Sequence, residues 1–191
     1  MYDFNEVYIN ACNTPSDINE HLPVLDRLAK DCKHVTEFGV RDGVSTIVWF
    51  NNKVDVVGYD LYQSPQAWQF FTNANLNGQS AQYKIENILA LPDIEETDLL
   101  FIDSLHNYDQ CIYELTKFSH RVRKYIVFHD TISYGKVGEP PYGTTVPVPP
   151  HGLVLAIGEF LLNNRDWFVK EHHTNNNGLA VLERKIPSII G

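Results

Sequence analysis

Short apolar runs alternate with helically spaced apolar residues between residues 34 and 130. The runs predict five strands, at residues 34–38, 54–60, 81–85, 97–103 and 125–128. Helices are expected between them, over residues 43–51, 64–71 and 108–118. Because such alternation builds right-handed βαβ units, the pattern predicts an α/β fold with a parallel sheet and helices on both faces.

The chain before residue 34 has a weaker pattern. A helix is expected to begin near Thr14-Pro15-Ser16-Asp17, where hydroxyl and acidic side chains suit an N-cap. Apolar residues that share one face of it are Ile18, Leu22, Leu25, Leu28 and Ala29. The helix should end near Cys32, and Pro23 should make its early part irregular.

The alternation of strands and helices stops in the last third of the chain. Residues 131–151 contain five prolines and three glycines, which predicts a long functional or disordered loop. A helix over 152–163 and strands at 167–169 and 179–182 are expected to follow, with an antiparallel hairpin turn at Asn175–Gly178. We therefore expect one domain over residues 1–191: a helical segment (1–33), a βαβ core (34–130), the loop (131–151), and a closing helix and hairpin (152–191).

Charge and composition narrow the partners. Lys and Arg total 15 and Asp and Glu total 24, so the net charge is −9. Nucleic-acid binding is not expected, because it needs a basic face. The three cysteines form no CxxC pair, no apolar run approaches the roughly 20 residues of a membrane helix, and the N-terminus lacks a signal-peptide profile. These features predict a reduced, cytoplasmic protein with no membrane contact.

Polar residues follow the predicted strands. The first, second, fourth and fifth strands end at Glu37, Asp60, Asp103 and the pair His129-Asp130, and the third at Glu86-Asn87. Ligands of open α/β sheets bind at the carboxyl ends of the strands, near the point where strand order reverses. The fold should therefore gather these side chains along one edge of the sheet.

The turn after the first strand reads Glu37-x-Gly39-x-x-x-Gly43, which differs from the dinucleotide pattern GxGxxG. Glycines let the backbone approach a ligand closely. Asp60, at the end of the next strand, can accept hydrogen bonds from both ribose hydroxyls. The alternative is a purely structural turn with Asp60 as an ordinary N-cap.

This turn, together with Asp60, resembles the class I methyltransferases that use S-adenosylmethionine. The resemblance implies a Rossmann-like, doubly wound, mostly parallel seven-stranded sheet with an antiparallel last strand. It places cofactor contacts at Glu37, Gly39, Gly43, Ser45, Asp60, Asn87 and Asp103.

A second resemblance rests on Phe101-Ile102-Asp103-Ser104-Leu105-His106-Asn107-Tyr108 and Val127-Phe128-His129-Asp130-Thr131. These segments are similar to the small-molecule O-methyltransferase group that includes macrolide-sugar methyltransferases and cephalosporin-hydroxylase-like proteins. The resemblance implies a base at His106 and a divalent cation, Mg²⁺ or Mn²⁺, at Asp103, His129 and Asp130. His129 stands where metal-dependent members have an acid, and Mg²⁺ prefers oxygen ligands. The set suits Mn²⁺, Fe²⁺ or Zn²⁺ better, or no metal at all.

The chemistry of methyl transfer gives these residues roles. A hydroxyl acceptor must lose its proton, which a histidine can take, and the resulting gain is ~10²–10⁴-fold. We expect His106 to be the catalytic base, and Asp103 and Asp130 to orient the acceptor or a cation. The alternatives are that His106 caps the helix beginning near Tyr108, and that His129 packs at a strand end.

Several other residues have alternative interpretations. Trp68 follows Asp60 closely enough to reach the adenine rim, or belongs to the core. Tyr134 and Tyr142 contact the acceptor or anchor the loop. His172 and His173 resemble a metal pair, but neighbours in a strand point to opposite faces, so surface histidines are expected.

The sequence thus predicts an S-adenosylmethionine-dependent methyltransferase that acts on a hydroxyl of a small molecule or sugar. The 131–151 loop would cover the acceptor, and a deep pocket would need a second subunit, hence a homo-oligomer. Three alternatives remain: a nicotinamide oxidoreductase, a metal-dependent hydrolase, and a non-catalytic nucleotide-binding module.

Overall fold

A seven-stranded sheet organises the computed structural model, which describes residues 1–141, 144 and 150–185. The strands are β1 (His34–Phe38), β2 (Asp55–Asp60), β3 (Ala81–Ile85), β4 (Thr97–Ile102), β5 (Val122–His129), β6 (Trp167–His173) and β7 (Leu179–Arg184). Their spatial order is β3-β2-β1-β4-β5-β7-β6. Strand order reverses at β1, which pairs with β2 on one side and with β4 on the other.

The first five strands are mutually parallel, and β7 runs antiparallel between β5 and β6. The register brings Phe38 beside Tyr59 of β2 and Ile102 of β4, so the carboxyl ends of these strands lie at one edge. The predicted doubly wound, mostly parallel sheet with an antiparallel last strand is confirmed.

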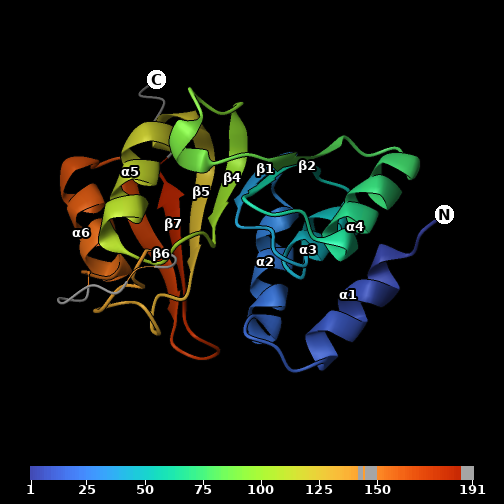
Figure 1. The fold of residues 1–191 in the computed structure, drawn as a ribbon, viewed down its shortest axis with the longest axis horizontal. Helices are drawn as coiled ribbons and strands as arrows, with labels where there is room; N and C mark the ends of the chain where they lie inside the picture. The colour runs from blue at the N-terminus through green and yellow to red at the C-terminus, as the bar shows by residue number, and fades with distance from the viewer. Residues whose placement is uncertain (142–143, 145–149, 186–191) are drawn as a thin grey trace, which may run out of the picture.

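Helices cover both faces of the sheet (Figure 1). One layer holds α1 (Phe4–Asn13), α2 (Leu22–Ala29), α3 (Thr46–Asn51) and α4 (Pro65–Leu76), and the other holds α5 (Tyr108–Phe118) and α6 (Leu153–Asn163). Short 3₁₀ turns η1 (Asn19–His21), η2 (Ile88–Ala90) and η3 (Ser119–Arg121) complete the order. Across the described residues, none of these helices has both the length and the apolar character needed to span a membrane.

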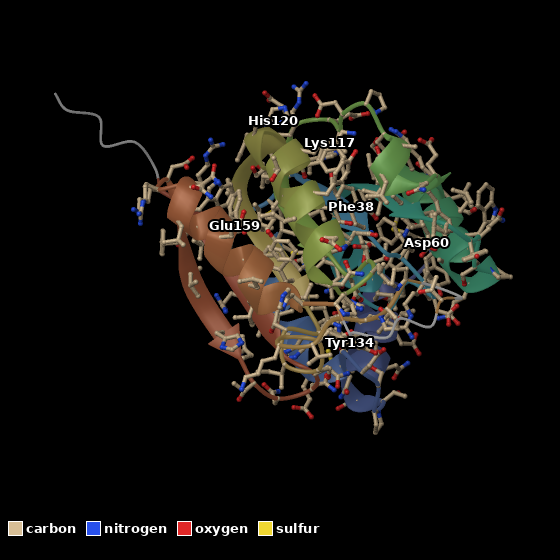
Figure 2. The ribbon with its side chains drawn as sticks, turned by 60° about the vertical axis from the view of Figure 1, so that its left-hand side comes forward. Phe38, Asp60, Lys117, His120, Tyr134 and Glu159 are labelled. Carbon is tan, nitrogen blue, oxygen red and sulfur yellow. The ribbon has the colours of Figure 1, made fainter. Side chains whose placement is uncertain are left out.

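The central strands are buried on both faces because successive side chains alternate between the two layers. In β4, Leu99 and Phe101 pack against the α1–α4 layer, whereas Leu100 and Ile102 pack against α5 and α6. Figure 2 shows Phe38, at the end of β1, in the interior beside α5, with Tyr134 at one end of this helix and Lys117 and His120 at the other. The N-terminal end of α5 therefore faces the carboxyl edge of the sheet.

The N-terminal segment differs from the prediction. A helix, α1, occupies Phe4–Asn13, where Asp3 accepts hydrogen bonds from the backbone N–H groups of Asn5 and Glu6. The helix expected near Thr14–Asp17 begins only at Leu22, after η1. Pro23 lies in its first turn, where a proline needs no N–H donor, so the predicted irregularity is a delayed start.

The β6–β7 hairpin tip is tied to two distant segments. Asn176, Asn177 and Gly178 all adopt left-handed backbone conformations, which form the tight turn. The backbone N–H of Ile132 donates to Asn177 O (2.9 Å), and the N–H of Glu20 donates to Asn176 Oδ1 (3.0 Å). The tip thus joins the N-terminal segment to the loop after β5.

Candidate active site

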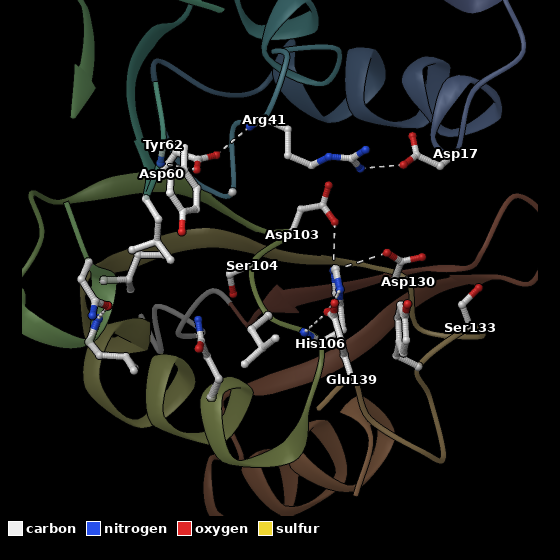
Figure 3. A pocket seen from close by; sticks show the side chains of 18 of the residues that line it. Asp17, Arg41, Asp60, Tyr62, Asp103, Ser104, His106, Asp130, Ser133 and Glu139 are labelled. Atoms are coloured by element: carbon white, nitrogen blue, oxygen red, sulfur yellow. Dashed lines mark hydrogen bonds and ion pairs between the residues drawn. The ribbon is translucent and has the colours of Figure 1, made fainter. Parts of the chain in front are cut away.

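A cavity of about 710 Å³ lies over the carboxyl ends of β1, β2, β4 and β5 (Figure 3). Its walls come from segments that are far apart in the sequence. The lining includes Asp17, Gly39, Arg41, Asp60, Tyr62, Asn87, Asp103, Ser104, His106, Gln110, Asp130, Ser133, Tyr134, Glu139 and Asn177. Four strand-end residues that the sequence analysis predicted therefore line the same cavity: Asp60, Asn87, Asp103 and Asp130.

Gly39 allows two strand ends to meet. Its φ is +88°, in the left-handed region, and a Cβ at this position would lie 2.1 Å from the carbonyl oxygen of Asp103. Its N–H donates to Tyr59 O of the neighbouring strand (2.9 Å). Only glycine fits this close approach, so the backbone of the turn lies directly against Asp103 and no side chain fills the cavity there.

The wall beyond this turn is formed by Asp60 and Asn87. The carboxylate of Asp60 accepts from the backbone N–H groups of Arg41 (2.7 Å) and Tyr62 (3.0 Å), which fixes its direction. Asn87 Oδ1 accepts from the N–H of Leu89 (3.0 Å). Each carboxylate oxygen keeps a second acceptor site, so capping the turn leaves Asp60 able to bind hydroxyl groups.

Glu37 lies behind the glycine turn, outside the cavity lining. It is fully buried and accepts hydrogen bonds from Ser45 Oγ, Thr46 Oγ1 (2.7 Å) and Trp49 Nε1 (3.2 Å). Burial, opposed in part by these hydrogen bonds, raises the pKa of Glu37 to about 7. Glu37 therefore anchors the start of α3 to β1 and shapes the turn from beneath.

Gly43 and Ser45, the other predicted cofactor contacts near this turn, also lie off the main cavity. Gly43 has φ +78°, and a Cβ there would face the side chain of Phe70 on α4 at 3.1 Å. Ser45 borders a smaller cavity of about 60 Å³ that shares Asp17, Arg41 and Asp103 with the larger one. The small cavity extends the site past the glycine turn.

A cluster of histidines and carboxylates occupies the opposite end of the cavity. His106 Nε2 lies 3.1 Å from Asp103 Oδ1 and 3.4 Å from Asp130 Oδ2, and its Nδ1 lies 3.2 Å from Glu139 Oε2. His129 Nδ1 lies 3.2 Å from the same Asp103 oxygen. Figure 3 shows His106 between the three acids.

These contacts shift the pKa values of the cluster. Burial opposes ionisation of Asp103, but hydrogen bonds from His106 and His129 outweigh it and hold the pKa of Asp103 below its usual value. Burial also disfavours the charged form of His106, yet Asp103, Asp130 and Glu139 raise its pKa. The same balance, with Asp103 and Asp130 as partners, raises the pKa of His129 to about 10.

The predicted metal ligands Asp103, His129 and Asp130 meet only part of what an ion needs. Asp103, His129 and Asp130 each offer a donor atom within 4.8 Å of the others, so the group is compact enough for an ion. A metal-bound imidazole usually donates its second N–H to a carboxylate, carbonyl or water. His129 Nε2 is buried and has no hydrogen-bond partner among the described residues. With a nitrogen in place of an oxygen donor as well, the set does not fit Mg²⁺.

Two acids of the site were not expected from the sequence. Glu139 lies in the proline-rich loop and contacts His106, while the buried Glu114 of α5 accepts from Ser104 Oγ (2.7 Å) and Gln110 Nε2 (2.9 Å). Burial raises the pKa of Glu114 to about 7. A polar residue on the inner face of the 108–118 helix was the signal for Glu114; no periodicity marks Glu139.

The remaining aromatic and histidine candidates differ in whether they contact the site. The Tyr134 ring stacks on His106, with centroids 5.2 Å apart, whereas Tyr142 lies outside the described residues. Trp68 is half-exposed and outside the cavity lining. His172 is exposed on β6, and His173 Nε2 contacts Glu171 (3.0 Å), so these two histidines form no pair.

No protein-family model matches the sequence, and no curated protein matches it significantly. Solved structures do share its fold. The O-methyltransferase TomG from Streptomyces achromogenes, in complex with SAM, is 15% identical; 97% of this chain and 91% of that chain align, with a TM-score of 0.64.

Two further structures cover most of the chain. For an O-methyltransferase from Bacillus cereus in complex with SAH, identity is 18%, coverage 95% and 89%, and the TM-score 0.64. For the N-methyltransferase NodS from Bradyrhizobium japonicum, the values are 16%, 89% and 97%, and 0.59. At these identities the likeness shows a shared methyltransferase-type fold.

Proposed function

We propose that this protein is an S-adenosylmethionine-dependent methyltransferase that methylates a hydroxyl of a small molecule or sugar. One observation carries the proposal: a single cavity joins the close-approach turn at Gly39, the strand-end acid Asp60 and the His106 cluster. The turn and the acid suit a nucleoside ligand, and the cluster suits proton removal. The methyltransferase-type fold supports the same assignment.

The cavity walls divide into two parts for this purpose. Asp60 would accept hydrogen bonds from the ribose, while Asn87 and the exposed apolar side chains of Tyr62 and Leu89 would border the base. Gly39 and Asp103 would lie beside the methionine part, with Ser45 and the smaller cavity beyond them. Glu37 and Gly43 would act indirectly, by holding the turn.

Once bound, the cofactor supplies an electrophilic methyl group on a sulfonium centre. His106 would take the proton of the acceptor hydroxyl while the new O–CH₃ bond forms and the S–CH₃ bond breaks. In the neutral ring one nitrogen donates to a carboxylate and the other takes the proton. Asp103 and Asp130, beside Nε2, and Glu139, beside Nδ1, then stabilise the imidazolium and fix the ring. The stacked ring of Tyr134 limits its rotation further.

The acceptor side of the cavity suits a small molecule. Ser133, Tyr134 and Asn177 offer neutral hydrogen-bonding groups, and the net charge of −9 disfavours a nucleic-acid partner. We place the protein in the cytoplasm, without a membrane partner, on the sequence grounds given above. A homo-oligomer is proposed on the same grounds.

Calorimetric titration with S-adenosylmethionine tests the proposal. We expect saturable 1:1 binding by the wild type and roughly 10–100-fold weaker binding by Asp60→Asn, because one charged hydrogen bond is worth about 1.5–3 kcal/mol. Asp55→Asn is the matched control, since Asp55 lies at the other end of the same strand. No binding by the wild type would refute the function.

The alternatives predict other results. A nicotinamide oxidoreductase would bind NAD and reject S-adenosylmethionine. A hydrolase using Asp103, His129 and Asp130 would need a metal and would act without the methyl donor. A non-catalytic module would bind the cofactor but show no His106-dependent transfer to any acceptor.

A further inference from the structure

The two carboxylates at the ends of β4 and β5 are bridged by imidazole nitrogens. His129 Nδ1 lies 3.2 Å from Asp103 Oδ1 and 3.6 Å from Asp130 Oδ2. His106 Nε2 approaches the same two oxygens, at 3.1 and 3.4 Å. Each of the two oxygens therefore lies near two imidazole nitrogens, and the two acids are bridged without another group.

The backbone supports this arrangement. Asp130 has φ 59°, a left-handed conformation that a non-glycine residue keeps only where its surroundings enforce it. Asp130 directly follows His129, the last residue of β5, and the Asp130 carboxylate faces His106. The strand end is thus shaped to place Asp130 beside Asp103.

The ring of His129 is also enclosed. Its side chain is 1% exposed, and the ring of the buried His21 lies edge-on to it, with centroids 5.7 Å apart. An ion at Asp103 and Asp130 would have to displace the Nδ1 contacts of this buried ring. The second nitrogen, Nε2, has no acceptor among the described residues and lacks the support that a metal ligand normally has.

We propose that His129 is a positioning residue that takes the place of a divalent cation, bridging Asp103 and Asp130 so that the site works without metal. The role in methyl transfer rests on the proposed function. The bridging role does not, because it concerns only whether these strand ends accept an ion. The substitution His129→Asp should therefore create a metal site from three strand-end carboxylates.

The test is titration with Mn²⁺, followed by calorimetry and by electron paramagnetic resonance of the unbound ion. We expect no saturable site in the wild type and one site per chain in His129→Asp, at least tenfold tighter than any residual wild-type binding. Adding Asp103→Asn to His129→Asp should remove that site. His172→Asp, which adds the same carboxylate on the exposed face of β6, should bind no ion.

Each result decides the question. One equivalent of Mn²⁺ bound by the wild type and lost in Asp103→Asn would overturn the proposal. An absence of binding in both wild type and His129→Asp would also overturn it, because His129 would then not be the group that replaces the ion.

Circular dichroism and S-adenosylmethionine titration check that His129→Asp is folded. If it is not, His129→Asn supplies one oxygen donor without a third charge and should also gain a site. Where transfer to an acceptor is measurable, the wild type should be insensitive to EDTA and His129→Asp should become Mn²⁺-dependent. Failure of S-adenosylmethionine binding alone would refute the proposed function and leave the metal result standing.

Discussion

Glu114 allows a measurable link between pH and stability. Its carboxyl group is fully buried on α5, where Oε1 accepts from Ser104 and Gln110 while Oε2 has no partner among the described residues. Burial raises its pKa from 4.5 to about 7. The folded protein therefore keeps this proton between about pH 4.5 and 7, whereas the unfolded chain releases it. Since the folded state binds more protons in this window, stability falls as pH rises through it.

The magnitude follows from the pKa. A tenfold change in a proton-dissociation constant is worth about 1.4 kcal/mol, so ionising Glu114 in the folded state costs about 3 kcal/mol at pH 8 or above. In Glu114→Gln the amide oxygen can accept the same two hydrogen bonds and nothing ionises. Part of this effect is already present at pH 5, so we expect its free energy of unfolding, relative to the wild type, to increase by about 2–3 kcal/mol between pH 5 and 8.

Urea unfolding followed by circular dichroism at pH 5, 6, 7 and 8 measures this difference. Glu37, whose pKa is also raised to about 7, contributes the same slope to both proteins and cancels. Glu95→Gln, at an exposed position, is the control and should track the wild type. If the stability difference between Glu114→Gln and the wild type changes by less than about 1 kcal/mol from pH 5 to pH 8, the reasoning is refuted.

Three other predictions concern the site and the core. The rate of methyl transfer should rise with pH through a pKa above 6.5, because the acids around His106 raise its pKa and the base must be neutral; a flat profile would contradict the role. Gly39→Ala should unfold at lower temperature and lose S-adenosylmethionine binding in calorimetry, since its Cβ would overlap the Asp103 carbonyl; unchanged binding would exclude a close-packed turn. A disulfide reagent such as DTNB should modify only Cys12 in the native protein, because Cys32 and Cys111 are buried; a second fast thiol would contradict that packing.

Much of the site could be predicted from the residues that end the strands. Asp60, Asp103 and Asp130 follow apolar runs whose parallel pairing could be predicted, so their convergence followed from the topology. Glu37 shows the limit of that argument, because side chains two residues apart in a strand share a face. Val35 packs under the α1–α4 layer, so Glu37 points beneath α3 and away from the cavity.

Other features could not be predicted, because the sequence pattern that marks them is too weak. Within α1 (Phe4–Asn13) only Phe4 is buried, so the amphipathic pattern of this helix is faint. Glu139 reaches His106 from an irregular loop, where no periodicity ties sequence position to direction. The ion pair of Asp17 with Arg41 (2.6 Å) joins two loops and depends entirely on tertiary packing.

The hairpin tip has a consequence for how the protein is made. Asn177 borders the cavity, while its neighbours on the tip bind Glu20 and His21 near the other end of the chain. During synthesis the central strands emerge well before this hairpin, so a ribosome-bound chain carries the cluster at Asp103 and His106 with its rim still unassembled. The cavity wall at Asn177 can therefore form only once the hairpin has been made, so completion of the cavity is a late event in folding.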